Sequence, residues 1–129
     1  MAEKVPERRA QRILLAEDEV LVAADVETML KELGCEVVGP VATVAEVERL
    51  AAVEPLDGAV LDVNLRGVRV FGALSVLRAR QIPVILSSGY ESSALFPEGF
   101  RELPVLVKPY DRGELAALLR AAFGLRNSI

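Results

Sequence analysis

The stretch Gly58-Ala-Val-Leu-Asp-Val-Asn64 decides the fold. Pro55 precedes it, and the apolar run at residues 59–61 is typical of a strand that is buried on both faces of a parallel sheet. Asp62 follows where this strand leaves the sheet. Because open α/β sheets bind ligands at the carboxyl ends of their strands, we interpret Asp62 as the centre of a functional site.

Apolar stretches before and after this strand alternate with segments of helical spacing. The predicted strands cover residues 12–16, 36–38, 58–62, 83–87 and 104–107. The predicted helices cover residues 20–33, 43–53, 71–80 and 111–123, with a short or broken helix between 91 and 101, where Pro97 and Gly99 interrupt the pattern. This alternation predicts an α/β fold, with a parallel sheet that carries helices on both faces.

The length of 129 residues indicates one domain, which we place at residues 12–125. Residues 1–11 are polar, so we expect a flexible N-terminal tail, and residues 126–129 form a C-terminal tail. The single cysteine, Cys35, excludes an internal disulfide, and no stretch resembles a signal peptide or a membrane span. These features favour a cytoplasmic protein without a membrane partner.

Composition excludes several classes of function. The net charge of −4 and the absence of tryptophan argue against a nucleic-acid partner. The chain has no histidine, so it lacks the commonest general base and the commonest metal ligand. A bound metal must therefore be held by oxygen atoms, which indicates a hard cation such as Mg²⁺.

Charged and hydroxyl side chains follow four of the predicted strands. The pair Glu17-Asp18 follows the first strand, Asp62 ends the third, Ser88 follows the fourth and Lys108 follows the fifth. Parallel strands end at one edge, so we expect these residues to converge. Crowded carboxylates repel one another, and Mg²⁺ would relieve that repulsion while it neutralises an incoming phosphoryl group. We therefore interpret Asp62 as a phosphoryl acceptor.

Each of these residues also has an ordinary structural explanation. Glu17-Asp18 could be a solvated acidic turn at a helix N-terminus, and Asp62 could be a loop aspartate. Ser88 could be a turn hydroxyl, and Lys108 could simply mark the exit of a strand. A functional site is favoured because these coincidences would all have to occur at the same edge of one sheet.

Four motifs in order resemble those of two-component response-regulator receiver domains of the CheY type. They are Ile13-Leu-Leu-Ala-Glu-Asp-Glu19, Val60-Leu-Asp-Val-Asn-Leu-Arg-Gly67, Pro83-Val-Ile-Leu-Ser-Ser-Gly89 and Val107-Lys-Pro-Tyr110. The resemblance covers almost the whole chain. It implies a flavodoxin-like, doubly wound, five-stranded parallel sheet of order 2-1-3-4-5 over residues 12–125.

The resemblance also implies a role for each matching residue. Asp62 corresponds to the phosphorylated aspartate, Ser88 to the hydroxyl that senses the phosphoryl group, and Lys108 to the lysine of the family motif. The implied Mg²⁺ ligands are Glu17, Asp18, Asp62 and the backbone carbonyl of Asn64. A sensor histidine kinase or a histidine phosphotransfer protein would supply the phosphoryl group, and an unidentified protein target would receive the signal.

The chain departs from the usual receiver pattern at one position. The switch aromatic of the family lies three residues before the lysine, and that position is Val105 here. This substitution, together with the 63–67 and 88–90 segments, resembles the FAT GUY receivers, which imply an atypical fourth helix. Nothing follows the last helix, so we expect a stand-alone receiver without a DNA-binding output module.

Two other functions compete with the phosphorylated receiver. A phosphohydrolase of the haloacid-dehalogenase type would also use an aspartate, a lysine and Mg²⁺. It needs a second aspartate two residues after the nucleophile, where this chain has Asn64, which cannot act as a carboxylic acid. The other alternative is a receiver that docks to a partner without being phosphorylated.

Overall fold

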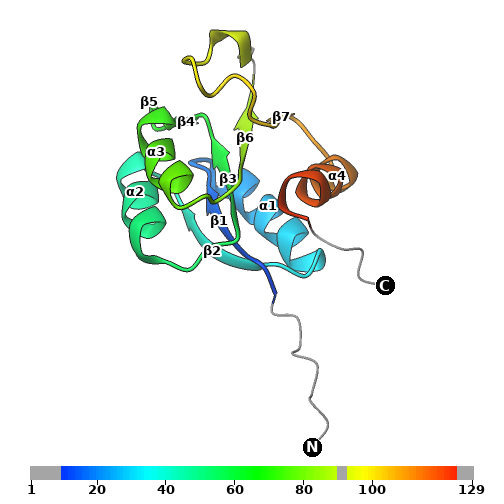
Figure 1. The fold of residues 1–129 in the computed structure, drawn as a ribbon. Coiled ribbons are helices and arrows are strands. Elements are labelled where there is room, and N and C mark those ends of the chain that lie inside the picture. The colour runs from blue at the N-terminus through cyan, green and yellow to red at the C-terminus, as the bar shows by residue number, and fades with distance from the viewer. Residues whose placement is uncertain (1–9, 90–92, 125–129) are drawn as a thin grey trace, which may run out of the picture.

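The computed structural model describes residues 10–89 and 93–124, and it shows a five-stranded parallel sheet between two layers of helices (Figure 1). The sheet has the order β2-β1-β3-β6-β7, which is the predicted 2-1-3-4-5 order. Its strands are β1 (Arg12–Ala16), β2 (Glu36–Val41), β3 (Gly58–Asp62), β6 (Val84–Ser88) and β7 (Val105–Val107). The helices are α1 (Val20–Glu32), α2 (Val44–Val53), α3 (Phe71–Ala79) and α4 (Arg112–Phe123).

Alternating side chains of the central strands build one hydrophobic core on each face of the sheet. In β1, Leu14 points to the core under α2 and α3, whereas Ile13 and Leu15 point to the core under α1 and α4. All five residues of β3 are buried, as the apolar run predicted. Gly58 begins this strand because a Cβ there would lie 2.7 Å from the ring of Phe123.

Two helices begin with a side-chain cap at residues 43 and 111, which are the first residues of the predicted helices. The Thr43 side chain accepts a hydrogen bond from the Glu46 N–H at the start of α2. Asp111 and Glu114 form a complete capping box at the start of α4, and Gly124 ends that helix at a φ of 70°. Within the described part of the chain, no helix is long and apolar enough to cross a membrane.

The structure differs from the prediction in two connections. Strand β2 continues through Gly39-Pro40 to Val41, which an edge strand tolerates because one side of it has no hydrogen-bonding neighbour. The segment predicted as a loop after Asp62 contains a small antiparallel hairpin of β4 (Asn64–Leu65) and β5 (Val68–Arg69). Arg66 and Gly67 turn this hairpin with φ angles of 52° and 83°.

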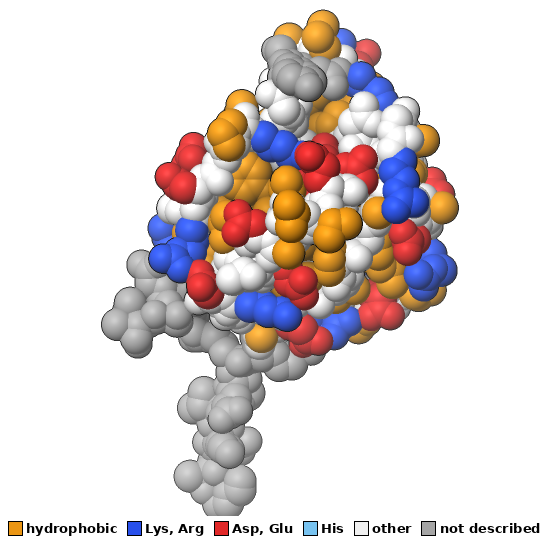
Figure 2. Space-filling view, turned by 180° about the vertical axis from the view of Figure 1, so that it is seen from behind, with side chains coloured by type: hydrophobic (Ala, Val, Ile, Leu, Met, Phe, Trp, Pro, Cys, Tyr) orange, Lys and Arg blue, Asp and Glu red, His pale blue; other side chains and the backbone are white. Residues whose placement is uncertain are grey.

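The connection between β6 and β7 contains little helix. Its described part, residues 93–104, holds a single 3-10 turn, η1 (Ser93–Leu95), in agreement with the predicted short or broken helix. Residues 90–92 lie outside the described residues, as do the two predicted tails except for residues 10 and 11. The reverse face of the molecule mixes charges of both signs with a group of hydrophobic side chains near its centre (Figure 2).

Candidate functional site

The carboxyl ends of four strands bring the predicted site residues to one edge of the sheet. Asp62 ends β3, and it lies opposite Ser87 in the register of β6. Ser88 is the last residue of β6 and is buried, and its carbonyl accepts a 2.9 Å hydrogen bond from the Lys108 N–H. Glu17 directly follows β1 and is also buried. The ends of β1, β3, β6 and β7 therefore position these side chains.

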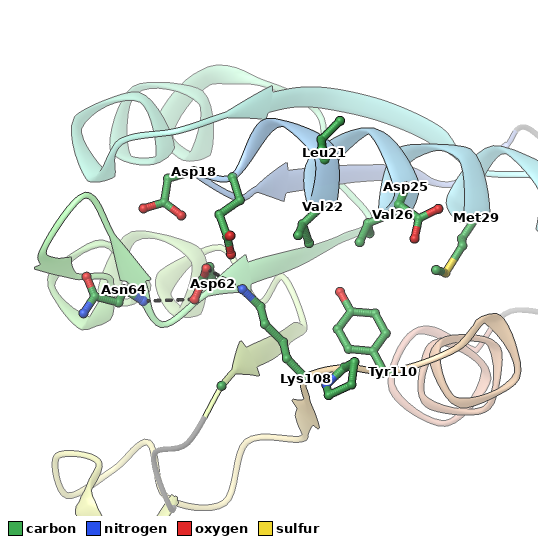
Figure 3. Close-up of a pocket in the computed structure, with 13 residues that line it drawn as sticks. Asp18, Leu21, Val22, Asp25, Val26, Met29, Asp62, Asn64, Lys108 and Tyr110 are labelled. Carbon is green, nitrogen blue, oxygen red and sulfur yellow. Dashed lines mark hydrogen bonds and ion pairs between the residues drawn. The ribbon is translucent and has the colours of Figure 1, made fainter.

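Lys108 bridges two of the carboxylates. Its Nζ lies 2.9 Å from Glu17 Oε1 and 2.9 Å from Asp62 Oδ2. The side chains of Glu17 and Asp62 are only 3% and 9% exposed, whereas that of Lys108 is 20% exposed. Figure 3 shows Lys108 reaching across to Asp62, with Asp18 and Asn64 on the other side of the carboxylate.

Each of the three carboxylates also accepts one backbone N–H. Glu19 N–H donates to Glu17 at 3.0 Å, Arg66 N–H donates to Asp18 at 2.8 Å, and Asn64 N–H donates to Asp62 at 3.2 Å. Hydrogen bonds to the charged form of a carboxylate favour that form. These N–H groups hold the carboxylate oxygens in fixed orientations around one point.

Burial and hydrogen bonding act in opposite directions on the pKa of Glu17 and on the pKa of Lys108. Burial raises the pKa of Glu17 and the nearby Asp62 charge adds to the rise, while hydrogen bonds from Lys108 and Glu19 oppose it. Burial alone would lower the pKa of Lys108, but its hydrogen bonds to Asp62 and Glu17 outweigh this effect and raise it. Lys108 is therefore a permanent cation at neutral pH, and the Glu17 carboxylate is held at a cost in free energy.

The carboxylates are arranged as a metal site. One oxygen from each of Glu17, Asp18 and Asp62 lies within 4.8 Å of the others. Three carboxylates and one ammonium leave a formal charge of −2, which a divalent cation balances. Because carboxylate oxygens are the ligands that Mg²⁺ prefers, this donor set fits that ion. Asn64 lies beside these residues in the same pocket.

A pocket of about 860 Å³ extends from the carboxylates along helix α1. Asp62, Lys108 and the segment Pro109-Tyr110 line it at one side. Its α1 wall consists of Leu21, Val22, Asp25, Val26 and Met29. Val22, Val26 and Met29 also pack in the core on this face of the sheet, whereas Leu21 is 84% exposed beside the acidic residues.

Tyr110, the last residue of the Val107-Lys-Pro-Tyr110 motif, also lines the pocket. Its ring lies beside the Lys108 side chain and points from the segment before α4 toward α1 (Figure 3). Burial raises the pKa of its phenol, so the group is neutral at physiological pH. Tyr110 therefore lines the pocket with an apolar ring and a neutral hydroxyl group, between the acidic residues and the part of the pocket that extends along α1.

Most of the chain, including the sheet and the acidic site, matches a known protein family. Residues 13–120 match the response regulator receiver domain. The chain belongs to this family. Receiver domains are phosphoacceptor signalling modules rather than catalytic enzymes, and histidine kinases phosphorylate them. Membership therefore decides against the phosphohydrolase alternative.

Solved receiver structures are similar to this chain over nearly their whole length. The solution structure of SdrG from Sphingomonas melonis Fr1 is 36% identical, with a TM-score of 0.77 over 88% of this chain and 97% of SdrG. The receiver domain of the sensor histidine kinase PA1611 from Pseudomonas aeruginosa PAO1 is 30% identical, with a TM-score of 0.72 over 89% of this chain and 98% of that domain. In the PA1611 structure a magnesium ion is coordinated in the active-site cleft.

Curated relatives are longer than this chain. The phyllosphere-induced regulator PhyR of Methylorubrum extorquens is 29% identical over 122 residues, which are 92% of this chain and 46% of PhyR. The transcriptional regulatory protein PdtaR of Mycobacterium tuberculosis is 29% identical over 87% of this chain and 56% of its own length. The chain spans about half the length of the curated relatives it matches.

Proposed function

We propose that Asp62 accepts a phosphoryl group and that the acidic site around it holds the Mg²⁺ that this transfer requires. The observation that carries the proposal is the bridge from Lys108 to Glu17 and Asp62, with an Asp18 oxygen within 4.8 Å of theirs. The Lys108 ammonium and a bound cation would balance the negative charge of the buried Asp62 carboxylate, which acts as the nucleophile.

The side chains divide the work of transfer among them. An Asp62 oxygen attacks the phosphorus of a phosphohistidine, an O–P bond forms, the N–P bond breaks, and the electron pair and a proton remain on the donor's imidazole. Glu17, Asp18, Asp62 and the backbone carbonyl of Asn64 would hold Mg²⁺, which neutralises charge on the phosphoryl oxygens. Lys108 moves its ammonium from the carboxylates to one phosphoryl oxygen, and the Ser88 hydroxyl donates to another.

The phosphohistidine that donates the group lies outside these 129 residues, since they contain no histidine. The part of the pocket that extends along α1 supports a sensor histidine kinase or a histidine phosphotransfer protein as that donor. Its α1 wall is apolar at Val22, Val26 and Met29, and acidic residues such as Asp18 and Asp25 also line it. A partner helix that presents its histidine between apolar and basic neighbours would match both properties.

The signal leaves through altered protein–protein binding. The phosphoryl group on Asp62 attracts the Ser88 hydroxyl. The segment after β6 then changes conformation, because its described part has little regular structure, only one 3-10 turn. Val105 in place of the usual aromatic supports membership of the FAT GUY subgroup. SdrG, which is similar to this chain, has a BeF₃-activated conformation. We place this receiver at residues 12–125 with short tails, and in the cytoplasm, where Cys35 stays reduced.

Intact-mass measurement after incubation with acetyl phosphate and Mg²⁺ tests the proposal. The parent protein gains one phosphoryl group, and Asp62→Asn gains none. Asp57→Asn is the matched control, because Asp57 accepts a hydrogen bond from the Arg12 N–H at the opposite edge of the sheet. Phosphoryl uptake that persists in Asp62→Asn contradicts the assignment, and a parent that is never modified but binds its partner favours the docking receiver instead.

A further inference from the structure

The segment between β6 and β7 is attached to α3 by three phenylalanine rings, which we call the phenylalanine cluster: Phe71, Phe96 and Phe100. The Phe71 and Phe96 ring centroids lie 5.0 Å apart, and those of Phe71 and Phe100 lie 5.6 Å apart. Phe96 is only 1% exposed although it lies in an irregular connection. A fully buried ring in a segment with one 3-10 turn indicates that side-chain packing determines the position of this segment.

One arginine attaches the same segment to α3, and a second arginine makes a contact within the segment. Arg78 in α3 donates to the Gly99 carbonyl at 2.7 Å, and its guanidinium lies 4.6 Å from the centroid of the Phe100 ring. Arg101 donates from Nε to the Phe96 carbonyl at 2.8 Å. Side-chain contacts therefore fix the position of residues 96–101 relative to α3. These contacts replace the backbone hydrogen bonds that a regular helix would provide.

The phenylalanine cluster is connected to the acidic site through the β4–β5 hairpin. Phe71 is the first residue of α3 and follows the hairpin directly. At the base of the hairpin, the Val70 N–H donates to the Val63 carbonyl at 2.8 Å, and Val63 is the neighbour of Asp62. At its tip, the Arg66 N–H donates to Asp18 Oδ2 at 2.8 Å.

Asp18 thus serves two partners. Its carboxylate accepts the hydrogen bond that holds the hairpin tip, and it is one of the three carboxylates that surround the metal position. Arg66 has a φ of 52°, a conformation that residues other than glycine adopt at a cost, so this hydrogen bond helps to hold the turn. A cation or phosphoryl group that interacts with the Asp18 carboxylate therefore changes the hydrogen bond between Asp18 and the Arg66 N–H at the hairpin tip.

We propose that occupation of the acidic site is transmitted through the β4–β5 hairpin to the phenylalanine cluster, where Phe96 is the aromatic side chain that moves. This inference rests on the proposed function. It supplies the coupling that Val105 cannot supply from β7, and it acts on the segment from its α3 side, independently of Ser88. A shift of Phe71 with the hairpin changes the packing of Phe96 and Phe100 together, because both rings contact it.

Fluorine NMR of protein labelled with 4-fluorophenylalanine tests this coupling. The chain has four phenylalanines, so the spectrum has four signals, and Phe123 is an internal control because it packs near Gly58 in the other core. Saturation with Mg²⁺ and beryllofluoride should shift the Phe96 and Phe71 signals. The Phe123 signal should stay in place.

Substitutions of the hairpin separate this route from Ser88. Arg66→Pro removes the N–H, and proline cannot adopt a positive φ. Arg66→Gly keeps the N–H and allows a positive φ, so it is the matched control. At saturating beryllofluoride, the shift of Phe96 should fall at least fivefold in Arg66→Pro and persist in Arg66→Gly. Phe71→Leu breaks the same route in the core and should also suppress the Phe96 shift.

The outcomes distinguish the two proposals. A Phe96 signal that responds equally in the parent, Arg66→Pro and Phe71→Leu overturns the hairpin route. A parent that binds beryllofluoride, as amide shifts around Asp62 would show, without any Phe96 shift also overturns it. A parent that takes up neither beryllofluoride nor a phosphoryl group refutes the proposed function itself, together with the inference that rests on it.

Discussion

The two edges of the sheet use similar charged groups in different surroundings. At the amino-terminal edge, the Arg12 guanidinium contacts Glu36 and Glu54 at 2.7 Å each, and the carboxylates are 55% and 34% exposed. At the carboxyl-terminal edge, the Lys108 ammonium contacts Glu17 and Asp62 at 2.9 Å each, and these carboxylates are 3% and 9% exposed. Each edge has one cation between two carboxylates.

The difference lies in burial and in the charge that remains. Water screens the carboxylates around Arg12, so this edge is a structural clamp of small energetic weight. The carboxylates around Lys108 are removed from water, and Asp18 adds a third negative charge to them. The free energy that crowding costs at the carboxyl-terminal edge is recovered when a cation binds there, so this edge responds to ligands and the other does not.

Mg²⁺ should have the greatest effect on the difference between the edges. At a free concentration of 100 times its Kd, the ion should raise the free energy of unfolding by about 2.7 kcal/mol, since only the folded chain assembles the three carboxylates. Thermal unfolding across a Mg²⁺ titration measures this gain at constant ionic strength. Asp18→Asn should lose most of the gain and Arg12→Met should keep it; equal gains in both variants would contradict the assignment.

Removal of each cation should reveal the difference in burial. Lys108→Met leaves two buried carboxylates without their cation and should cost about 2 kcal/mol. Arg12→Met removes contacts to exposed carboxylates and should cost about 1 kcal/mol or less. Urea denaturation measures both values without Mg²⁺. The comparison fails if Arg12→Met is the more destabilised of the two.

Glu17→Gln should have the smallest effect, and pH determines its sign. Folding raises the pKa of Glu17 above its ordinary value of 4.5, so its contribution to stability is present below pH 4.5 and is lost as the pH rises through the folded-state pKa. Glu17→Gln should therefore raise the Tm modestly at pH 7, and the gain should disappear near pH 4. A gain that persists at pH 4 would mean that side-chain packing, not charge, is responsible.

Local patterns in the chain were sufficient to predict the sheet. The apolar run before Asp62 predicted a strand buried on both faces, and all five residues of β3 are buried. The predicted helices that start at residues 43 and 111 begin at the caps of α2 and α4, and a cap depends on residues that are three positions apart. The β4–β5 hairpin was missed, since its turn has Arg66 at a positive φ and no Asn-Gly or Asp-Gly signal.

The convergence of Glu17, Asp62 and Lys108 followed from the sequence as well, because parallel strands must end at one edge. The contacts between them did not follow. Neither the Lys108 bridge nor the hydrogen bond from Arg66 to Asp18 has a signature in the sequence, since the partners in these contacts are 46 to 91 residues apart in the chain.

The sequence by itself determined the α/β architecture, the receiver family and the residues that meet at the acidic site. Apolar periodicity and short motifs act over a few residues, so a single chain can be interpreted at that range. Only the tertiary structure decided that Phe96 is buried against α3 and that Asp18 holds the hairpin. Such contacts depend on how side chains fill the space between distant elements, and packing of this kind leaves no periodic pattern in the chain.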